Sequence, residues 1–257
     1  MLKVESAVAT HSGMRREGNE DAFCVRPDLG LYIVADGMGG HAAGEVASKT
    51  AVDTIEAFIN DTRDADANRT WPFPYDTTLS MAGNRLKAAF RLANRRLGVA
   101  MAGDENLRGM ATTAAAVLID DGRPAIAHVG DSRVYRLRDG ELQQITDDHS
   151  WVSEQVRAGI LSDADARRHP WRNVVTRAIA GGDDPDVEIA DLLLANGDRL
   201  LICSDGLSGV VPPDRLVAIL LRQASLKDTC QALIDSANEA GGPDNITVLM
   251  AQIVDVA

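Results

Sequence analysis

The sequence predicts an α+β fold: a four-layer αββα sandwich in which two antiparallel sheets face each other and a helix pair covers the outer side of each. Apolar segments of strand length are joined by short turns, which favours antiparallel pairing. Two pairs of helical segments separate these groups of strands, and placing them outside the sheets would bury the apolar side of every element. We find no internal repeat, low-complexity tract or linker in the 257 residues, so we expect one domain over residues 1–257.

The N-terminal part is expected to hold three strands and then two long helices. Apolar runs separated by turn signals predict the strands at Leu2–Ala9, Ala22–Val25 and Leu31–Ala35. Apolar residues at helical spacing predict a helix over Ala43–Ile59 and a second one over Leu79–Met101. The polar segment Asn60–Asp76 contains two prolines, and we expect it to be a loop between the helices.

The C-terminal part returns to strands before a second helix pair. The predicted strands are Thr112–Ile119, Ala125–Val129, Val134–Leu137, Val187–Leu194, Leu200–Cys203 and Ile246–Val254. Asp120-Asp121-Gly122 and Asp139-Gly140 are expected to form hairpin turns. Helices are predicted near Asp214–Arg222 and over Leu226–Glu239, the second with Ser225 as its N-cap. The mixed, polar segment 147–182 is expected to be a flap around short helices.

Composition excludes several classes of protein. A net charge of −12 disfavours nucleic acid or an anionic membrane as a general partner, because both need a basic surface. No apolar run approaches the length of a membrane helix and no apolar signal core follows the first residue, so we expect a cytoplasmic protein without a membrane partner. The three cysteines, Cys24, Cys203 and Cys230, lie in apolar stretches and are expected to be reduced and buried, not catalytic.

The chemical signal is a repeated junction between an apolar strand and an aspartate. The strand LYIVA runs into Asp36-Gly37, AIAHV runs into Gly130-Asp131, and LLICS runs into Asp205-Gly206. Asp244 instead stands just before the last strand. In an antiparallel sheet the start of one strand lies beside the end of its neighbour, so the four carboxylates could gather on one rim. The alternative is that they belong to ordinary turns dispersed over the surface.

A gathered cluster of carboxylates would need either protons or cations. Two unit charges about 4 Å apart repel by about 4 kcal/mol at an effective dielectric constant near 20. Oxygen ligands favour Mg²⁺ or Mn²⁺ over zinc, and the carbonyl of Gly37 could join them because glycine permits a close approach. The charged stretch 16–21 is either a solvated loop or part of the same rim. On the rim, Arg16 could hold a phosphate while Asp21 hydrogen-bonds metal-bound water.

Five motifs stand at these junctions: R-x-x-N-E-D at 16–21, V-A-D-G-M-G-G-H at 34–41, G-D-S-R at 130–133, S-D-G-L at 204–207 and G-P-D-N-I-T-V at 242–248. In this order they resemble the motifs of the metal-dependent PP2C-type (PPM) serine/threonine protein phosphatases of bacterial type. T-D-D-H-S at 146–150 and the region 172–181 are similar to the bacterial flap. The resemblance covers residues 6–254 and implies the same sandwich, with a binuclear Mg²⁺ or Mn²⁺ centre at one end.

The resemblance implies a role for each residue of that centre. Asp36 would bridge both metals, and the carbonyl of Gly37 would bind one of them. Asp205 and Asp244 would complete the other metal. Asp131, together with Asp205, matches a third, weaker metal site of bacterial members.

The resemblance implies that three residues of the first motif lie around the metals without binding them directly. Glu20 and Asp21 would bind the metals through waters, and Arg16 would orient the substrate phosphate. The implied reaction is hydrolysis of phosphoserine and phosphothreonine in proteins by a hydroxide that bridges the metals, without a phosphoenzyme.

The resemblance implies phosphorylated protein substrates and an opposing serine/threonine kinase, and we expect a monomer. Two other functions stay open: a catalytically silent PP2C-like binding module and a hydrolase of small phosphoesters. Calcium binding alone is disfavoured, since the sequence has no D-x-[DN]-x-[DN]-G loop.

Two positions depart from the family pattern. Eukaryotic members have a histidine after D-G, proposed as the acid that protonates the leaving group, where this chain has Met38. Protonation of the leaving group would then need a metal-bound water or another group. His41 could be that acid or could instead be structural, and His149 could contact the substrate. Gly209 stands where some members have another aspartate, so a third metal would be held weakly here.

Overall fold

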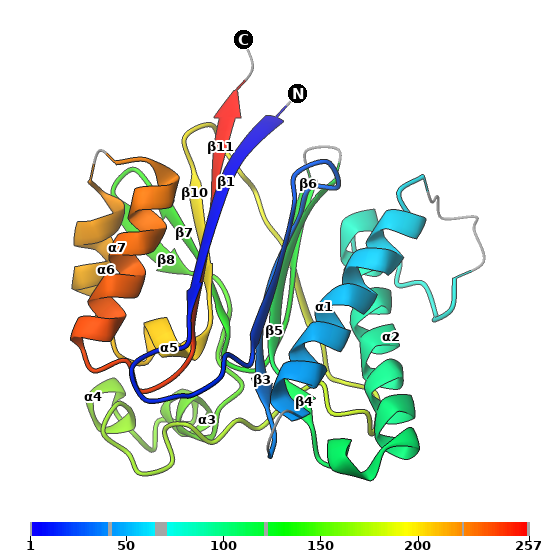
Figure 1. Cartoon of the computed structure of the whole chain (residues 1–257). Coiled ribbons are helices and arrows are strands. Elements are labelled where there is room, and N and C mark those ends of the chain that lie inside the picture. Colours follow the sequence, from blue (N-terminus) through cyan, green and yellow to red (C-terminus); the bar gives the residue numbers. More distant parts are fainter. Residues whose placement is uncertain (1, 41–42, 65–70, 121–122, 223, 256–257) are drawn as a thin grey trace.

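The computed structural model describes residues 2–40, 43–64, 71–120, 123–222 and 224–255. Two antiparallel sheets stack face to face, with α6 and α7 outside one sheet and α1 and α2 outside the other (Figure 1). The predicted αββα sandwich is therefore confirmed. Both chain ends lie at one end of the sandwich, at the top of Figure 1. His41 and the turn at 121–122 lie outside the described residues.

The first sheet has the strand order β1-β11-β10-β7-β8. These strands are β1 (Leu2–His11), β11 (Ile246–Asp255), β10 (Arg199–Cys203), β7 (Arg133–Arg138) and β8 (Glu141–Gln144). The polar edge strand β8 was not predicted. It pairs with β7 because Asp139 and Gly140 both adopt positive φ, 51° and 84°, as a tight hairpin turn requires.

The second sheet has the order β2-β3-β5-β6-β9, and β4 pairs with the end of β3. Its strands are β2 (Asp21–Arg26), β3 (Leu31–Met38), β4 (Ala111–Thr112), β5 (Ala114–Asp120), β6 (Arg123–Val129) and β9 (Glu188–Asp191). The prediction of a strand over Val187–Leu194 was too long, because only Glu188–Asp191 pair with β6.

In the described part of the chain, four long helices cover the sheets and four short ones lie in the connections. The long helices are α1 (Ala43–Asp61), α2 (Met81–Gly103), α6 (Pro213–Leu220) and α7 (Leu226–Glu239). The short ones are the 3₁₀ helix Glu105–Leu107, α3 (Trp151–Arg157), α4 (Asp163–Ala166) and α5 (Asp205–Ser208). The Ser225 hydroxyl accepts a 3.1 Å hydrogen bond from the Asp228 N–H, which confirms the predicted cap of α7. None of the described helices has the length and hydropathy needed to cross a membrane.

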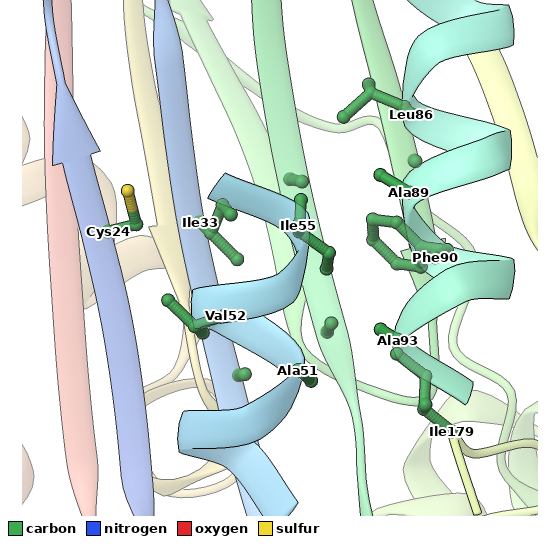
Figure 2. Packing of buried hydrophobic residues seen from close by; sticks show 14 of the residues in the cluster. Cys24, Ile33, Ala51, Val52, Ile55, Leu86, Ala89, Phe90, Ala93 and Ile179 are labelled. Carbon is green, nitrogen blue, oxygen red and sulfur yellow. The ribbon is translucent and has the colours of Figure 1, made fainter. Parts of the chain in front are cut away.

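Strand β3 is buried on both faces, which explains its unbroken apolar run. Side chains alternate along a strand, so Ile33 and Ala35 pack against α1 and α2 while Tyr32 and Val34 face the other sheet. Figure 2 shows the first of these layers, where the ring of Phe90 lies between α2 and the sheet. A third layer joins α6 and α7 to the first sheet.

The three cysteines are free and buried, as predicted. Burial is the main cause that raises the pKa of each thiol to about 12. Because the thiolate is the reactive form, none of the three is suited to act as a nucleophile at neutral pH.

We predict that Phe90→Ala lowers the free energy of unfolding by about 3–5 kcal/mol, since it opens a cavity in the layer between α2 and the sheet. Phe23→Ala is the matched control: this side chain is 40% exposed, and its loss should cost about 1 kcal/mol. Urea denaturation of both variants checks this. Equal losses would contradict the packing described above.

Candidate metal centre

Strand pairing brings the predicted aspartates to one end of the sandwich. Asp21, at the start of β2, lies opposite Asp36 in β3. The end of β10 pairs with the start of β11, which places Asp205 and Asp244 at the same end. Asp131 lies in the connection from β6 to β7, where the chain passes between the sheets. This is the end opposite the chain termini, at the bottom of Figure 1.

The carboxyl groups of Asp36 and Asp205 are close enough to share a hydrogen bond. Burial is the main cause that raises the pKa of Asp36 well above its ordinary value, and the charges of Asp21, Asp205 and Asp131 raise it further. The pKa of Asp205 is also raised, first by burial and then by the charge of Asp244. The raised pKa values favour a proton on this pair of carboxyl groups when no cation is bound.

Two further carboxyls of the cluster titrate near neutral pH. Burial, followed by the charges of Asp205 and Asp244, raises the pKa of Asp21 to about 7. Burial, with the charges of Asp205 and Asp148, raises the pKa of Asp131 to about 8. The carboxylates repel one another where water cannot screen them. As expected from the sequence, the cluster therefore needs either bound protons or bound cations.

Two carboxylate oxygens of the cluster are buried without a hydrogen-bond partner among the described residues: Oδ1 of Asp21 and Oδ1 of Asp205. The other oxygen of Asp21 accepts a hydrogen bond from the Ser204 hydroxyl at 2.9 Å. A buried carboxylate oxygen without a donor is costly, and a cation would remove that cost. An all-oxygen donor set of this kind fits Mg²⁺ or Mn²⁺.

Gly37 allows the first turn of α1 to lie directly against the end of β3. A Cβ on Gly37 would lie 2.1 Å from the carbonyl oxygen of Gly44, so any side chain would push the helix away. The backbone of Glu20 completes this junction, because its carbonyl accepts hydrogen bonds from the Gly37 N–H at 3.1 Å and from the Ser48 hydroxyl at 2.6 Å. The Glu20 side chain accepts from the Gly44 N–H at the start of α1, and burial raises its pKa.

Arg16 reaches the rim of the cluster from the loop before β2. Its Nη2 lies 2.8 Å from Oδ2 of Asp244, and its side chain is 49% exposed. The loop is held by Asn245, whose Oδ1 accepts from the Glu20 N–H at 2.8 Å. The amide of Asn245 donates to the carbonyls of Ser12 and Gly18. Sequence reasoning missed Asn245, although its place directly after Asp244 in the last motif could have indicated it.

A partly buried ion pair lies near Asp131 on its other side. Arg133 donates from Nε and Nη2 to the two oxygens of Asp148 at 2.8 and 2.6 Å, and from Nη1 to the Tyr135 hydroxyl at 2.8 Å. Such a two-point contact fixes both planar groups. Arg133 and Asp148 belong to the motifs G-D-S-R and T-D-D-H-S, but the sequence alone did not predict that they pair.

The protein-family profile described as Protein phosphatase 2C matches residues 11–250. The chain belongs to the protein phosphatase 2C family. The predicted fold and the predicted class of enzyme, a serine/threonine protein phosphatase acting on phosphorylated proteins, are thereby confirmed.

Relatives of this family match over almost the whole chain. A putative protein phosphatase 2C-type from Streptococcus pyogenes is 35% identical over 95% of this chain and 95% of its own length. The serine/threonine protein phosphatase PstP of Mycobacterium tuberculosis is 36% identical over 99% of this chain, which spans 46% of PstP.

The solved structures agree with the sequence comparison. A crystal structure of M. tuberculosis PstP is similar with a TM-score of 0.85 and 33% identity, covering 99% of this chain and all of that one. A structure of the PstP catalytic domain with two manganese ions has a TM-score of 0.83 and 34% identity, with coverage of 99% and 100%.

Within this phosphatase 2C fold, His149 is not placed to contact a substrate, because it is only 1% exposed. Its Nδ1 accepts from the Gly130 N–H at 3.1 Å, and its Nε2 lies 3.1 Å from a carboxylate oxygen of Glu188. Burial lowers the pKa of His149, so the ring is neutral and stacks on His128 at 4.5 Å. The residue instead holds the turn that carries Asp131.

His128, His149 and Glu188 also bring three possible ligand atoms within 4.8 Å of one another, which no three carboxylates of the described cluster do. The hydrogen bonds argue against a metal there. Since Nδ1 of His149 accepts a hydrogen bond from the Gly130 N–H, its Nε2 must carry the ring proton, and Nε2 of His128 donates to the carbonyl of Asp147. We interpret this group as a hydrogen-bonded support of the phosphatase centre.

We predict that the metal-free protein loses stability as the pH rises through the range in which Asp21 and Asp131 titrate. Carboxyls of the unfolded chain titrate near pH 4, whereas these two have folded-state pKa values of about 7 and 8. The folded state therefore binds more protons, and its advantage is lost at higher pH. The melting temperature in EDTA should fall from about pH 5 to about pH 8.5, and less steeply in Asp131→Asn. A melting temperature that stays level or rises over this range would contradict the prediction.

Proposed function

We propose that this chain hydrolyses phosphoserine and phosphothreonine in proteins with two divalent cations, Mn²⁺ or Mg²⁺. The observation that carries the proposal is the buried carboxylate cluster with raised pKa values and two unpartnered oxygens. Asp36, the carbonyl of Gly37, Asp205 and Asp244 would hold the two ions. Asp131, with Asp205, would hold a third ion weakly, because Gly209 adds no carboxylate there.

Two considerations support more than one ion. No three carboxylates of the described cluster bring oxygens within 4.8 Å of one another, so these donors do not converge on a single point. The catalytic domain of PstP, which is similar over 99% of this chain, is described in complex with two manganese ions.

Bound divalent cations lower the pKa of a coordinated water and neutralise charge on phosphoryl oxygens. Residues of this chain would bind the substrate phosphate and the waters around the ions. Arg16 is half-exposed beside Asp244, so its guanidinium can turn to a substrate phosphate and bind it by two hydrogen bonds. Asp21 and Glu20 would accept hydrogen bonds from waters around the ions. The buried thiols leave no cysteine nucleophile, which agrees with direct hydrolysis.

We further propose that the substrates are phosphorylated by a serine/threonine kinase that this enzyme opposes, that the enzyme acts as a monomer, and that residues 1–257 form one domain. The cytoplasmic location stays a prediction. A catalytically silent module would not need the three acidic ligands Asp36, Asp205 and Asp244, and this chain retains all of them.

We predict that Asp36→Asn or Asp205→Asn lowers turnover of p-nitrophenyl phosphate and of a phosphothreonine peptide by about a hundredfold or more, because each removes a ligand charge from the centre. The assay uses saturating Mn²⁺, with EDTA abolishing release by the wild type. Asp139→Asn is the control, since this exposed residue has a φ of 51° that asparagine also adopts. Wild-type rates in either ligand variant would exclude these residues from the metal centre.

Arg16→Ala should mainly raise KM for phosphate esters, because the guanidinium binds phosphate in the ground state as well as during reaction. Arg15→Ala serves as the neighbouring control on the same loop. Steady-state kinetics with p-nitrophenyl phosphate measure both constants. An unchanged KM in Arg16→Ala would remove this residue from the substrate site.

A further inference from the structure

A cleft of about 570 Å³ extends from Asp131 and Asp205 into the space between the flap and the first sheet. Helices α3 and α4 form one wall, and β7, β8 and the chain from α5 to α6 form the other. Figure 1 shows α3 and α4 below α5 at this end of the sandwich. The volume is that of a ligand pocket, and a phosphate at the metal centre would occupy only one end of it.

The two walls of the cleft offer apolar surface. Val152 and Ala166 line it from the flap, and Val211 and Leu216 line it from the opposite side. All four are part of the buried core, so the walls are fixed before a ligand arrives. Because each of the four exposes 9% of its surface or less, they offer a ligand only small apolar patches.

The flap adds three positive charges to the cleft. Arg157, Arg167 and Arg172 line it, and none of the three has an ion pair within the described part of the chain. Arg133 at the base differs, because Asp148 neutralises it. Outside the metal centre, the remaining acidic residues that line the cleft are Asp147 and Asp163. The three arginines outnumber these two acids, so the flap side of the cleft carries a net positive charge in a chain whose net charge is −12.

We propose that this cleft binds the peptide segment next to the phosphorylated residue, and that Arg157, Arg167 and Arg172 select segments that carry an anionic group. This inference rests on the proposed phosphatase function. The group would be a carboxylate or a second phosphate, since a guanidinium binds either by paired hydrogen bonds. Asp131, Asp205 and the three arginines line the same cleft, so a segment that extends along it from the metal centre would meet the arginines.

The test compares three phosphothreonine peptides of equal length whose flanking residues are glutamine, glutamate or a non-hydrolysable phosphonate. In the wild type, kcat/KM should be roughly three- to tenfold higher for an anionic flank than for glutamine, the range that a few exposed ion pairs contribute. The preference should shrink at high salt. The larger increase in kcat/KM, with the glutamate peptide or with the phosphonate peptide, shows whether a carboxylate or a second phosphate is the favoured group.

The triple variant Arg157→Gln, Arg167→Gln, Arg172→Gln should lose this preference while it keeps wild-type turnover of p-nitrophenyl phosphate, which is too small to reach the flap. Arg168→Gln is the matched control, because this exposed flap arginine does not line the cleft and its loss should leave the preference intact.

Two results would overturn the inference and leave the phosphatase proposal standing. One is equal kcat/KM for all three peptides in the wild type, and the other is an undiminished preference in the triple variant. Absence of metal-dependent turnover with every substrate would overturn the phosphatase proposal, and this inference with it.

Discussion

Mutual repulsion among buried carboxylates is the constraint on which the rest of this structure depends. Asp21, Asp36, Asp131 and Asp205 lie where water cannot screen them, and each has a raised pKa. Such a cluster is stable only with protons or cations, so the same burial that destabilises the empty site provides the affinity for divalent ions. The sandwich supplies the rigid frame that prevents these side chains from moving apart.

That frame depends on a few polar contacts between segments far apart in sequence. Asn245 ties the loop of Arg16 to the start of β11, and the Ser204 hydroxyl joins Asp21 to the end of β10. At the other side, His149 and the Arg133–Asp148 pair connect the flap to the turn of Asp131. Since the flap also lines the cleft proposed to bind the peptide, the same contacts hold the metal centre and that cleft in place.

Hydrophobic periodicity predicted the long elements well, because their apolar faces are a property of the local chain. It failed where a segment is short or polar. The edge strand β8 is mostly polar and depends on its turn and on β7. The four-residue helix α5 is too short to show a hydrophobic period. It forms where Gly206 lies against the Asn245 carbonyl, so closely that an added Cβ would be 1.9 Å from the carbonyl oxygen.

By itself, the sequence determined the order of strands and helices, the buried thiols, and the recurrence of Asp36, Asp131 and Asp205 at strand ends, since these follow from local pattern. Only the tertiary structure decided that the carboxyl groups of Asp36 and Asp205 meet, that His149 supports a turn instead of contacting a substrate, and that three flap arginines line one cleft. Each of these depends on distances between segments separated by many residues, and no local pattern of side chains encodes such distances.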